Sequence, residues 1–248
     1  MSELQHPESR SFERVADLYE RWRPGYPGDA VAWLAEHLEL APGRTVLDLG
    51  AGTGKLTRAL AETGARVIAV EPGEAMLAEL RRAVPGVEAL LGGAEQIPLP
   101  DRSVEAVAVG QAFHWFRHDE ALPELHRVLR PGGVVGLIWN GRDQDDPLQQ
   151  EISELIWPLA RGRAAAVDTS RFLAESELFG PLEERRFHFA QQLDADGVVG
   201  RILSISFVAA APAETQSEIE RRVREIVIAR GRPVTFPYVT DVYLSRAA

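Results

Sequence analysis

Three glycines, Gly50, Gly52 and Gly54, alternate with other residues directly after a short apolar run. Because glycine has no Cβ, the backbone amides of such a turn can approach a bound ligand closely. The spacing disfavours both phosphate-binding fingerprints. Lys55 takes the sixth position of the dinucleotide motif, and Leu56 stands where a P-loop needs Ser or Thr after its lysine. The turn therefore indicates either a ligand site lined by backbone or an ordinary tight turn from strand to helix.

An acidic residue, Glu71, closes the next apolar run about twenty residues beyond the glycines. A carboxylate in this place can accept hydrogen bonds from both hydroxyls of a ribose, and such charge-assisted bonds are strong. By itself Glu71 would also fit a solvated surface charge. Together, the glycine turn and Glu71 predict a nucleoside site.

The elements that must position these residues alternate between short apolar runs and helical patterns, which is typical of repeated βα units around a parallel sheet. The runs at 134–139 and 104–109 are almost continuously apolar, which indicates strands buried on both faces. Five strands are predicted in this part, at 45–49, 66–70, 87–91, 104–109 and 134–139. Further on, the pattern predicts strands at 184–193 and 235–245, and helices at 148–159 (broken at Pro158), 198–207 and 219–228.

Composition excludes several classes of protein. The chain has 248 residues and a net charge of −10, which disfavours nucleic acid and anionic membrane surfaces as partners. It has no cysteine, so disulfides, thiolate zinc sites and cysteine nucleophiles are excluded, and the six histidines lack the spacing of metal ligands. The N-terminus has no apolar secretory segment, and no run approaches the roughly 18 residues of a membrane span. We therefore expect a cytoplasmic protein without a metal.

Four segments, in this order and spacing, resemble the class I S-adenosylmethionine-dependent methyltransferases. They are VLDLGAGTG (46–54), VIAVEP (67–72), GGAEQIPLPDRSVEAVAVGQAFHWF (92–116) and HRVLRPGGVVGLIW (126–139). The chain is most similar to the type 11 small-molecule group, near trans-aconitate methyltransferase. The resemblance implies an α/β, Rossmann-like, doubly wound, seven-stranded mixed sheet with the last strand antiparallel. It also implies a helical lid at 1–40 and a methyltransferase domain at 41–248 with a helical insertion at about 194–231.

The same resemblance implies a cofactor site for S-adenosylmethionine, with S-adenosylhomocysteine as the product. Glu71 would hold the ribose, and Gln111 would lie beside the methionine end of the cofactor. Many relatives have Asp where this chain has Gly93, so the adenine contact would pass to Ala94 or Glu95. The full set of implied cofactor residues is Tyr19, Arg23, Asp48, Gly50, Ala51, Gly52, Glu71, Pro72, Ala94, Glu95 and Gln111.

The acceptor side is predicted from residues that follow the fourth and fifth strands. His114 is a candidate general base, although a histidine among aromatic neighbours more often packs or contacts substrate. Trp115, Phe116 and Trp139 could line an apolar acceptor pocket or belong to the core. Arg142, like Arg117, could clamp a carboxylate or be solvated; we expect His114, Trp115, Phe116, Trp139 and Arg142 to contact the acceptor.

The predicted function is methyl transfer from S-adenosylmethionine to a small molecule by in-line displacement. Whether the acceptor is a carboxylate, a hydroxyl or an amine stays open, as do the need for a base and the oligomeric state. Two alternatives stay open as well: a catalytically inactive regulatory protein that binds the cofactor, and a nicotinamide-dependent oxidoreductase.

Overall fold

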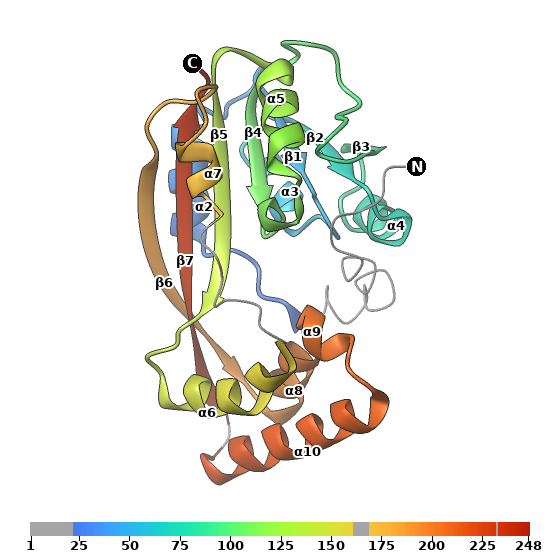
Figure 1. Ribbon diagram of the computed structural model, residues 1–248, viewed down its shortest axis with the longest axis vertical. Coiled ribbons are helices and arrows are strands. Elements are labelled where there is room, and N and C mark those ends of the chain that lie inside the picture. The colour runs from blue at the N-terminus through green and yellow to red at the C-terminus, as the bar shows by residue number, and fades with distance from the viewer. Residues whose placement is uncertain (1–21, 161–168, 232) are drawn as a thin grey trace.

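The computed structural model describes residues 22–160, 169–231 and 233–248 (Figure 1). Tyr19 and the first 21 residues of the predicted lid lie outside these ranges. None of the helices in the described ranges has the length and apolarity that crossing a bilayer requires.

A seven-stranded sheet forms the centre of the molecule, in the order β3-β2-β1-β4-β5-β7-β6. Strand β7 runs antiparallel to both of its neighbours, and the remaining pairs are parallel. This is the predicted mixed sheet with an antiparallel last strand. The strands are β1 (Thr45–Leu49), β2 (Arg66–Glu71), β3 (Glu88–Leu91), β4 (Val104–Gly110), β5 (Leu129–Arg142), β6 (Glu183–Leu193) and β7 (Val234–Arg246).

Helices cover both faces of the sheet because successive strand residues point to opposite sides and both sides are apolar. In β1, Val46 packs with α2 (Gly28–His37) and α3 (Lys55–Ala61), whereas its neighbour Leu47 packs with α5 (His118–Val128). Helix α4 (Glu74–Ala83) lies on the α3 side, through Leu80 against Ala69 of β2. The short helix α7 (Arg171–Ala174) lies on the α5 side, as Figure 1 shows.

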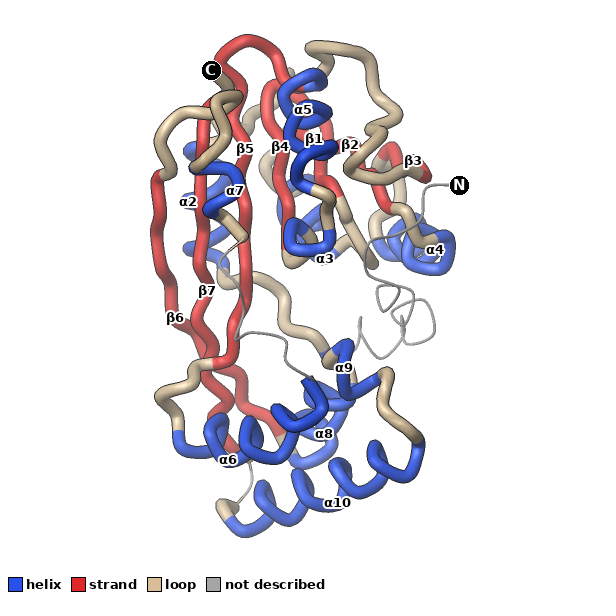
Figure 2. The backbone as a smooth tube through the Cα atoms, in the orientation of Figure 1, coloured by secondary structure: helices blue, strands red, loops and turns tan. Residues whose placement is uncertain are grey.

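Strand β5 is longer than the apolar run that predicted it. Its first residue, Leu129, pairs with Val104 of β4, and a register irregularity separates this pair from the regular ladder that begins at Ala106 and Val134. At its other end β5 continues to Arg142, beside β7. The extra length at this end reaches beyond the part of the sheet that α2 and α5 cover (Figure 2).

A second, smaller core forms where β5, β6 and β7 extend past the rest of the sheet. Phe236 and Tyr238 of β7 are completely buried there against four helices, which we call the helical cap (Figure 1). These helices are α6 (Pro147–Ile156), α8 (Ala195–Leu203), α9 (Ser206–Ala209) and α10 (Ala213–Ala229), and the short η3 (Trp157–Ala160) continues α6. Three of them, α8 to α10, lie between β6 and β7 in the chain, where helices were predicted.

The single helix predicted at 198–207 is wrong in one respect, because the structure divides it into α8 and α9. The Ser204 hydroxyl donates a hydrogen bond to the carbonyl oxygen of Arg201 at 2.7 Å, and Ile205 is extended. Serine side chains compete for backbone hydrogen-bonding groups in this way and weaken a helix interior. The break ends α8 with Arg201 inside its last turn.

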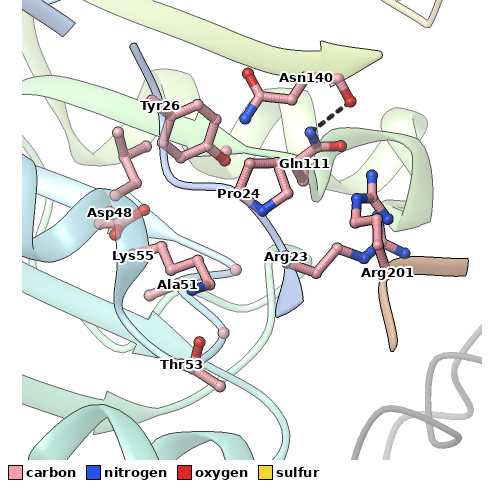
Figure 3. Close-up of a pocket in the computed structure, with 14 residues that line it drawn as sticks. Arg23, Pro24, Tyr26, Asp48, Ala51, Thr53, Lys55, Gln111, Asn140 and Arg201 are labelled. Carbon is pink, nitrogen blue, oxygen red and sulfur yellow. Dashed lines mark hydrogen bonds between the residues drawn. The ribbon is translucent and has the colours of Figure 1, made fainter. Parts of the chain in front are cut away.

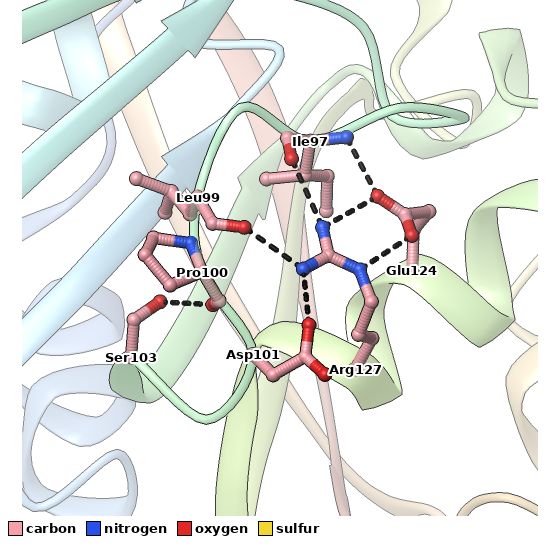
Figure 4. A network of polar contacts seen from close by, with 7 residues as sticks. All are labelled: Ile97, Leu99, Pro100, Asp101, Ser103, Glu124 and Arg127. Atoms are coloured by element: carbon pink, nitrogen blue, oxygen red, sulfur yellow. Dashed lines mark hydrogen bonds and ion pairs between the residues drawn. The ribbon is translucent and has the colours of Figure 1, made fainter.

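The loop between β3 and β4 is held by a group of residues around Arg127, which we call the Arg127 cluster (Figure 4). The Arg127 guanidinium donates to both carboxylate oxygens of Glu124, at 2.6 and 2.8 Å, and to Asp101 at 2.8 Å. It also donates to the carbonyl oxygens of Leu99 and Ile97, at 2.8 and 3.0 Å. Charge and hydrogen-bonding capacity are therefore satisfied within this cluster.

Candidate functional site

The candidate site is a pocket between the carboxyl ends of β1 and β4 and the helical cap (Figure 3). In the sheet order, β1 and β4 are the neighbours at which the chain reverses its direction of winding, and open α/β sheets bind ligands at such a point. The pocket encloses about 490 Å³, a volume that includes its opening to solvent. Six predicted residues line it: Arg23, Asp48, Gly50, Ala51, Gly52 and Gln111.

The glycine turn forms the floor of this pocket between β1 and α3. Gly50 has a φ of +71°, and a Cβ built on it would lie only 2.6 Å from the Cβ of Ala112. The amides of Gly50 and Ala51 donate to the carbonyl oxygen of Val70, at 2.8 and 3.1 Å. A side chain at position 50 would thus be strained and would clash, so this bare stretch of backbone requires glycine.

Glu71, at the end of β2, places its carboxylate against the glycine turn. One oxygen accepts the amide of Gly52 at 2.8 Å, and the other accepts the amide of Gly73 at 2.9 Å. The residue is 8% exposed, so the carboxylate is held firmly and almost withdrawn from water. Backbone amides from the turns after β1 and β2 therefore orient both oxygens of the carboxylate.

Asp48, in β1, lies beneath the turn and is 1% exposed. The hydroxyl of Thr57 donates to its Oδ2 at 2.6 Å. Burial raises the pKa of Asp48 to about 7, against the opposing effect of the Thr57 hydrogen bond, and the nearby charge of Glu71 raises it further. The pocket therefore contains a carboxyl group that changes its charge near neutral pH, and a cationic ligand group would favour the ionised form.

The end of β4 forms the opposite wall. Gln111 has a φ of +60°, an unusual conformation for a residue other than glycine, and its amide donates to the carbonyl oxygen of Ile138 at 3.0 Å. Its side-chain Nε2 donates to the carbonyl oxygen of Asn140 at 2.9 Å (Figure 3). Next to it, a Cβ on Gly110 would collide with the hydroxyl of Tyr26, so a glycine at this position leaves the space that the tyrosine side chain occupies. Strain at Gln111 is thus supported by bonds to β5.

Asn140 ties three segments together at this wall. Its Nδ2 donates to the carbonyl oxygen of Gly25 at 2.9 Å, and its Oδ1 accepts the hydroxyl of Thr240 at 2.7 Å. The connector that precedes α2 is thereby fixed to the ends of β5 and β7. Because Tyr26 belongs to this connector, its place in the pocket is fixed with it.

The cap side of the pocket is basic. Arg201 lines it from α8 and is 3% exposed, and Arg23 lies beside it, with its Nη2 donating to the carbonyl oxygen of Ser204 at 2.9 Å (Figure 3). The Nε of Arg201 donates to the hydroxyl of Tyr238 at 3.3 Å. Burial raises the pKa of Tyr238, while the charges of Arg201, Arg23 and Arg142 oppose this rise. Three guanidinium groups therefore act on one buried phenol.

None of the residues predicted to contact the acceptor lines this pocket, and the aromatic ones lie close to one another. His114 and Trp115 belong to the short helix η2 (Phe113–Trp115); the ring of His114 lies 4.6 Å from Trp115 and 6.2 Å from Trp139. Phe116 is buried, with its ring against Gly50. Arg142 donates to Ser153 and Gln149 of α6, and Arg117 pairs with Glu120. A role for these residues toward the acceptor stays a prediction.

Pro72, predicted for the cofactor site, and the predicted adenine contacts Ala94 and Glu95 also lie outside the pocket-lining set. Ala94 is buried, and Pro72 is exposed after β2. Glu95 accepts the backbone amide of Arg117 at 2.9 Å, and a Cβ on Gly93 would lie 3.2 Å from its other carboxylate oxygen. The Glu95 side chain thus lies beside position 93, and its contact with the adenine stays a prediction.

Several residues that line the pocket were not predicted: Tyr26, Thr53, Lys55, Asn140 and Arg201. Asn140 carried a signal, since it is the first polar residue after the apolar run 134–139. Arg201 also carried one, as a charged residue between apolar ones in a helical pattern. Within the described residues, no group of three or more His, Asp or Glu side chains could hold a metal ion.

Comparisons with known proteins agree with this geometry. The family described as a methyltransferase domain matches residues 47–137. An uncharacterized methyltransferase of Mycobacterium tuberculosis is 40% identical over 237 residues, spanning 94% of this chain and 93% of the relative. A second uncharacterized methyltransferase, from Schizosaccharomyces pombe, is 35% identical and spans 88% and 87% of the two chains. A solved structure from Anaeromyxobacter dehalogenans, assigned as a type II methyltransferase, is 29% identical with a TM-score of 0.67, covering 90% of this chain and 97% of the other.

Proposed function

The chain belongs to the methyltransferase family, and from that premise we propose that its pocket binds S-adenosylmethionine and delivers the methyl group to a small-molecule acceptor. The cofactor would occupy the floor between β1 and β4, and the acceptor would enter from the cap side. The observation that carries this proposal is the Glu71 carboxylate, which lies 2.8 Å from the Gly52 amide at the sheet's reversal point.

The residues present fit the cofactor. The backbone at Gly50 is kept bare of side chains, which suits a flat ligand that rests on the turn. Glu71 is an oriented carboxylate at the end of β2, of the kind that accepts hydrogen bonds from ribose hydroxyls, and Asp48 can carry a negative charge toward a cationic group. Arg23 could pair with the cofactor's carboxylate. Tyr19, Pro72, Ala94 and Glu95 keep the cofactor roles that the resemblance implies, as part of this proposal.

Bound S-adenosylmethionine supplies a methyl group activated by attachment to a sulfonium. The protein's part is to hold the acceptor in line and to exclude water, because positioning alone can provide most of the rate. Gln111, fixed to Asn140, and Tyr26, fixed through Gly25, provide a wall that is already in place. No proton needs to move if the acceptor is a carboxylate, whereas a hydroxyl or amine benefits from a base, for which His114 is the candidate.

The division of the chain into a lid at 1–40 and a catalytic domain at 41–248 is part of the same proposal. Its support is that Arg23 and Tyr26 line the pocket from this segment. In addition, Trp22 packs on α8, where a Cβ on Gly200 would lie 2.5 Å from its ring. The end of the N-terminal segment is therefore attached to the cap over the pocket.

The test is calorimetric titration of the protein with S-adenosylmethionine and S-adenosylhomocysteine, with NAD as a control. We expect micromolar binding, about −8 kcal/mol, of both sulfur nucleosides and none of NAD. The Glu71→Gln variant should lose about tenfold or more in affinity, since it weakens the charged acceptor. Glu74→Gln, on the exposed first turn of α4, is the matched control and should bind like the wild type.

Binding of NAD instead, or an unchanged affinity in Glu71→Gln, would contradict the proposed cofactor site. If the protein binds the cofactor, a second assay measures the transfer of labelled methyl groups to a panel of acceptors. Transfer to any of them distinguishes an active enzyme from a protein that only binds the cofactor.

A further inference from the structure

Arg201 is a buried cation with too few partners. Its one hydrogen bond within the described residues is the 3.3 Å contact to the hydroxyl of Tyr238, and its Nη1 is buried with no hydrogen-bond partner. An unsatisfied buried donor costs free energy, and a charged one costs more than a neutral one. Such a group in a folded protein calls for an explanation, and a bound ion or ligand that completes its hydrogen bonds is one.

Arg142 adds a second positive charge behind Arg201. It stands opposite Tyr238 in the β5–β7 ladder, and its guanidinium donates to the Ser153 hydroxyl at 2.9 Å and to the Gln149 amide oxygen at 3.3 Å. Burial and, next, the charge of Arg201 lower the pKa of Arg142 to about 10. Within the described residues, neither Arg142 nor Arg201 forms an ion pair, although the chain carries 37 acidic side chains.

Arginines elsewhere on the cap are treated differently. Arg224 of α10 pairs with Asp196 and Glu220, and Arg230 pairs with Glu151. Acidic residues are therefore available around the cap, but they lie on its exposed side. Arg201 lines the pocket, and Arg142 lies nearby without lining it; their hydrogen-bond partners among the described residues are neutral, which leaves a positive potential that a bound anion would neutralise.

We propose that Arg201 binds an oxyanion of the methyl acceptor, a carboxylate or a phosphate, and that Arg142 strengthens this binding by its charge. The acceptor is accordingly an organic acid or a phosphorylated compound, held on the cap side of the pocket. This inference rests on the proposed function, because it assumes that the cofactor occupies the glycine side. A guanidinium presents parallel donors that match the two oxygens of a carboxylate or phosphate.

The first experiment titrates the full-length protein, saturated with S-adenosylhomocysteine, with malonate, phosphate and the uncharged malonamide. We expect malonate or phosphate to bind and malonamide to bind at least about 30-fold more weakly. The stronger of the two anions identifies the acceptor's group as a carboxylate or a phosphate. Equal binding of malonamide and malonate would overturn the proposal.

Variants then assign the anion to Arg201. Arg201→Met should lower the anion's affinity by at least about 30-fold, and Arg201→Lys, which keeps the charge without the fork, should lower it less. Arg224→Met is the matched control on the same cap and should bind like the wild type. Unchanged anion binding in both Arg201→Met and Arg201→Lys would overturn the assignment. If Arg201→Met does not fold, the anion affinity of Arg201→Lys alone tests it.

A third measurement separates the acceptor's anion from the cofactor's own carboxylate. S-adenosylhomocysteine and methylthioadenosine, which lacks the amino-acid carboxylate, are titrated into the wild type and Arg201→Met. We expect the variant to bind both nucleosides within about twofold of the wild type, below the 1.4 kcal/mol of a tenfold change. A loss confined to S-adenosylhomocysteine would show that Arg201 serves the cofactor and would overturn the proposal.

Failure of the proposed function gives a different result. If the wild type binds neither nucleoside, the cofactor assignment fails, and the anion titrations are made on the free protein. Anion binding that depends on Arg201 would then preserve the anion site alone, and its absence would overturn both.

Discussion

Arg127 and Arg201 carry the same guanidinium group in opposite surroundings. The Arg127 guanidinium donates hydrogen bonds to two carboxylates and two backbone carbonyl oxygens, and the side chain is 30% exposed (Figure 4). Arg201 is 3% exposed, with one phenolic hydroxyl as its hydrogen-bond partner in the described part of the chain. The more buried of the two thus has the fewer partners, which is the reverse of what stability alone would select.

The same contrast separates the carboxylates. Glu124, in the Arg127 cluster, has its pKa lowered by the hydrogen bond from Arg127, whereas burial raises the pKa of Asp48 in the pocket. Paired charges hold a loop together, and incompletely paired charges surround the space where a ligand can complete them. This difference distinguishes a structural cluster from a candidate site more clearly than the residue types do.

The largest expected effect is the pH dependence that Asp48 contributes. Its pKa is raised from 3.8 to about 7 on folding, so the contribution is fully present below pH 4 and is lost as the pH rises through 7. The stability of the cofactor-free wild type relative to Asp48→Asn should fall by roughly 3 to 5 kcal/mol across this range, at 1.36 kcal/mol per pKa unit. Urea unfolding of both proteins at pH 4 to 8 measures this difference. If the difference in unfolding free energy between the two proteins does not change with pH, burial does not raise the pKa of Asp48 in the folded protein.

Removal of the paired arginine should follow in size. Arg127→Met leaves Glu124 and two carbonyl oxygens without their donor, and we expect a loss of roughly 2 kcal/mol in the free energy of unfolding. Arg221→Met, which removes an exposed arginine paired with Glu218 and Glu225, is the control and should cost much less, because exposed ion pairs contribute little to stability. Nucleoside affinity should stay unchanged in both. Equal losses of unfolding free energy in the two variants would show that the Arg127 cluster stabilises the fold no more than an exposed ion pair does.

A smaller effect is expected from Thr57→Val, which deletes the hydroxyl that donates to Asp48 while keeping the shape of the residue. The variant should lose about 1 kcal/mol at pH 8, where Asp48 is ionised, and less at pH 4. The midpoint of the Asp48 transition should move to higher pH, because the lost bond favoured the ionised form. A shift to lower pH in the unfolding curves would contradict this account.

The smallest effect on stability is expected from Arg201→Met. Methionine has a similar reach but no charge to bury, so the free energy of unfolding should stay within about 1 kcal/mol of the wild type or increase. Thermal unfolding without ligand is sufficient to measure it. A loss comparable to that of Arg127→Met would indicate that Arg201 is a structural residue, and the contrast with the Arg127 cluster would fail.

The sheet side of the pocket could be predicted from the sequence because each of its residues is fixed by a short segment. Gly50 directly follows β1 and Glu71 ends β2, and the carboxyl ends of parallel strands meet at one edge. Asp48, near the end of β1, was implied by the family resemblance and lines the pocket. The mixed sheet with its antiparallel last strand followed from the family resemblance and is confirmed by the strand order.

The cap side could not be predicted in this way. Arg201 reaches the pocket because α8 ends at the Ser204 turn and packs against Tyr238, which is 37 positions further along the chain. Tyr26 enters because Asn140 holds Gly25 across 115 positions. Such contacts depend on how distant segments pack, and periodicity within one segment carries no information about them.

The continuous ladder between β5 and β7 has a consequence for how this protein can diversify. It runs unbroken from Val134 opposite Arg246 to Arg142 opposite Tyr238, so one ladder supports both the sheet and the cap. Insertion or deletion of a single residue within it would turn every following side chain to the other face. Changes of length are therefore confined to the connections outside the ladder, such as the one at 210–212 between α9 and α10. The cap's connections can therefore vary in length without disturbing the ladder that joins β5 to β7.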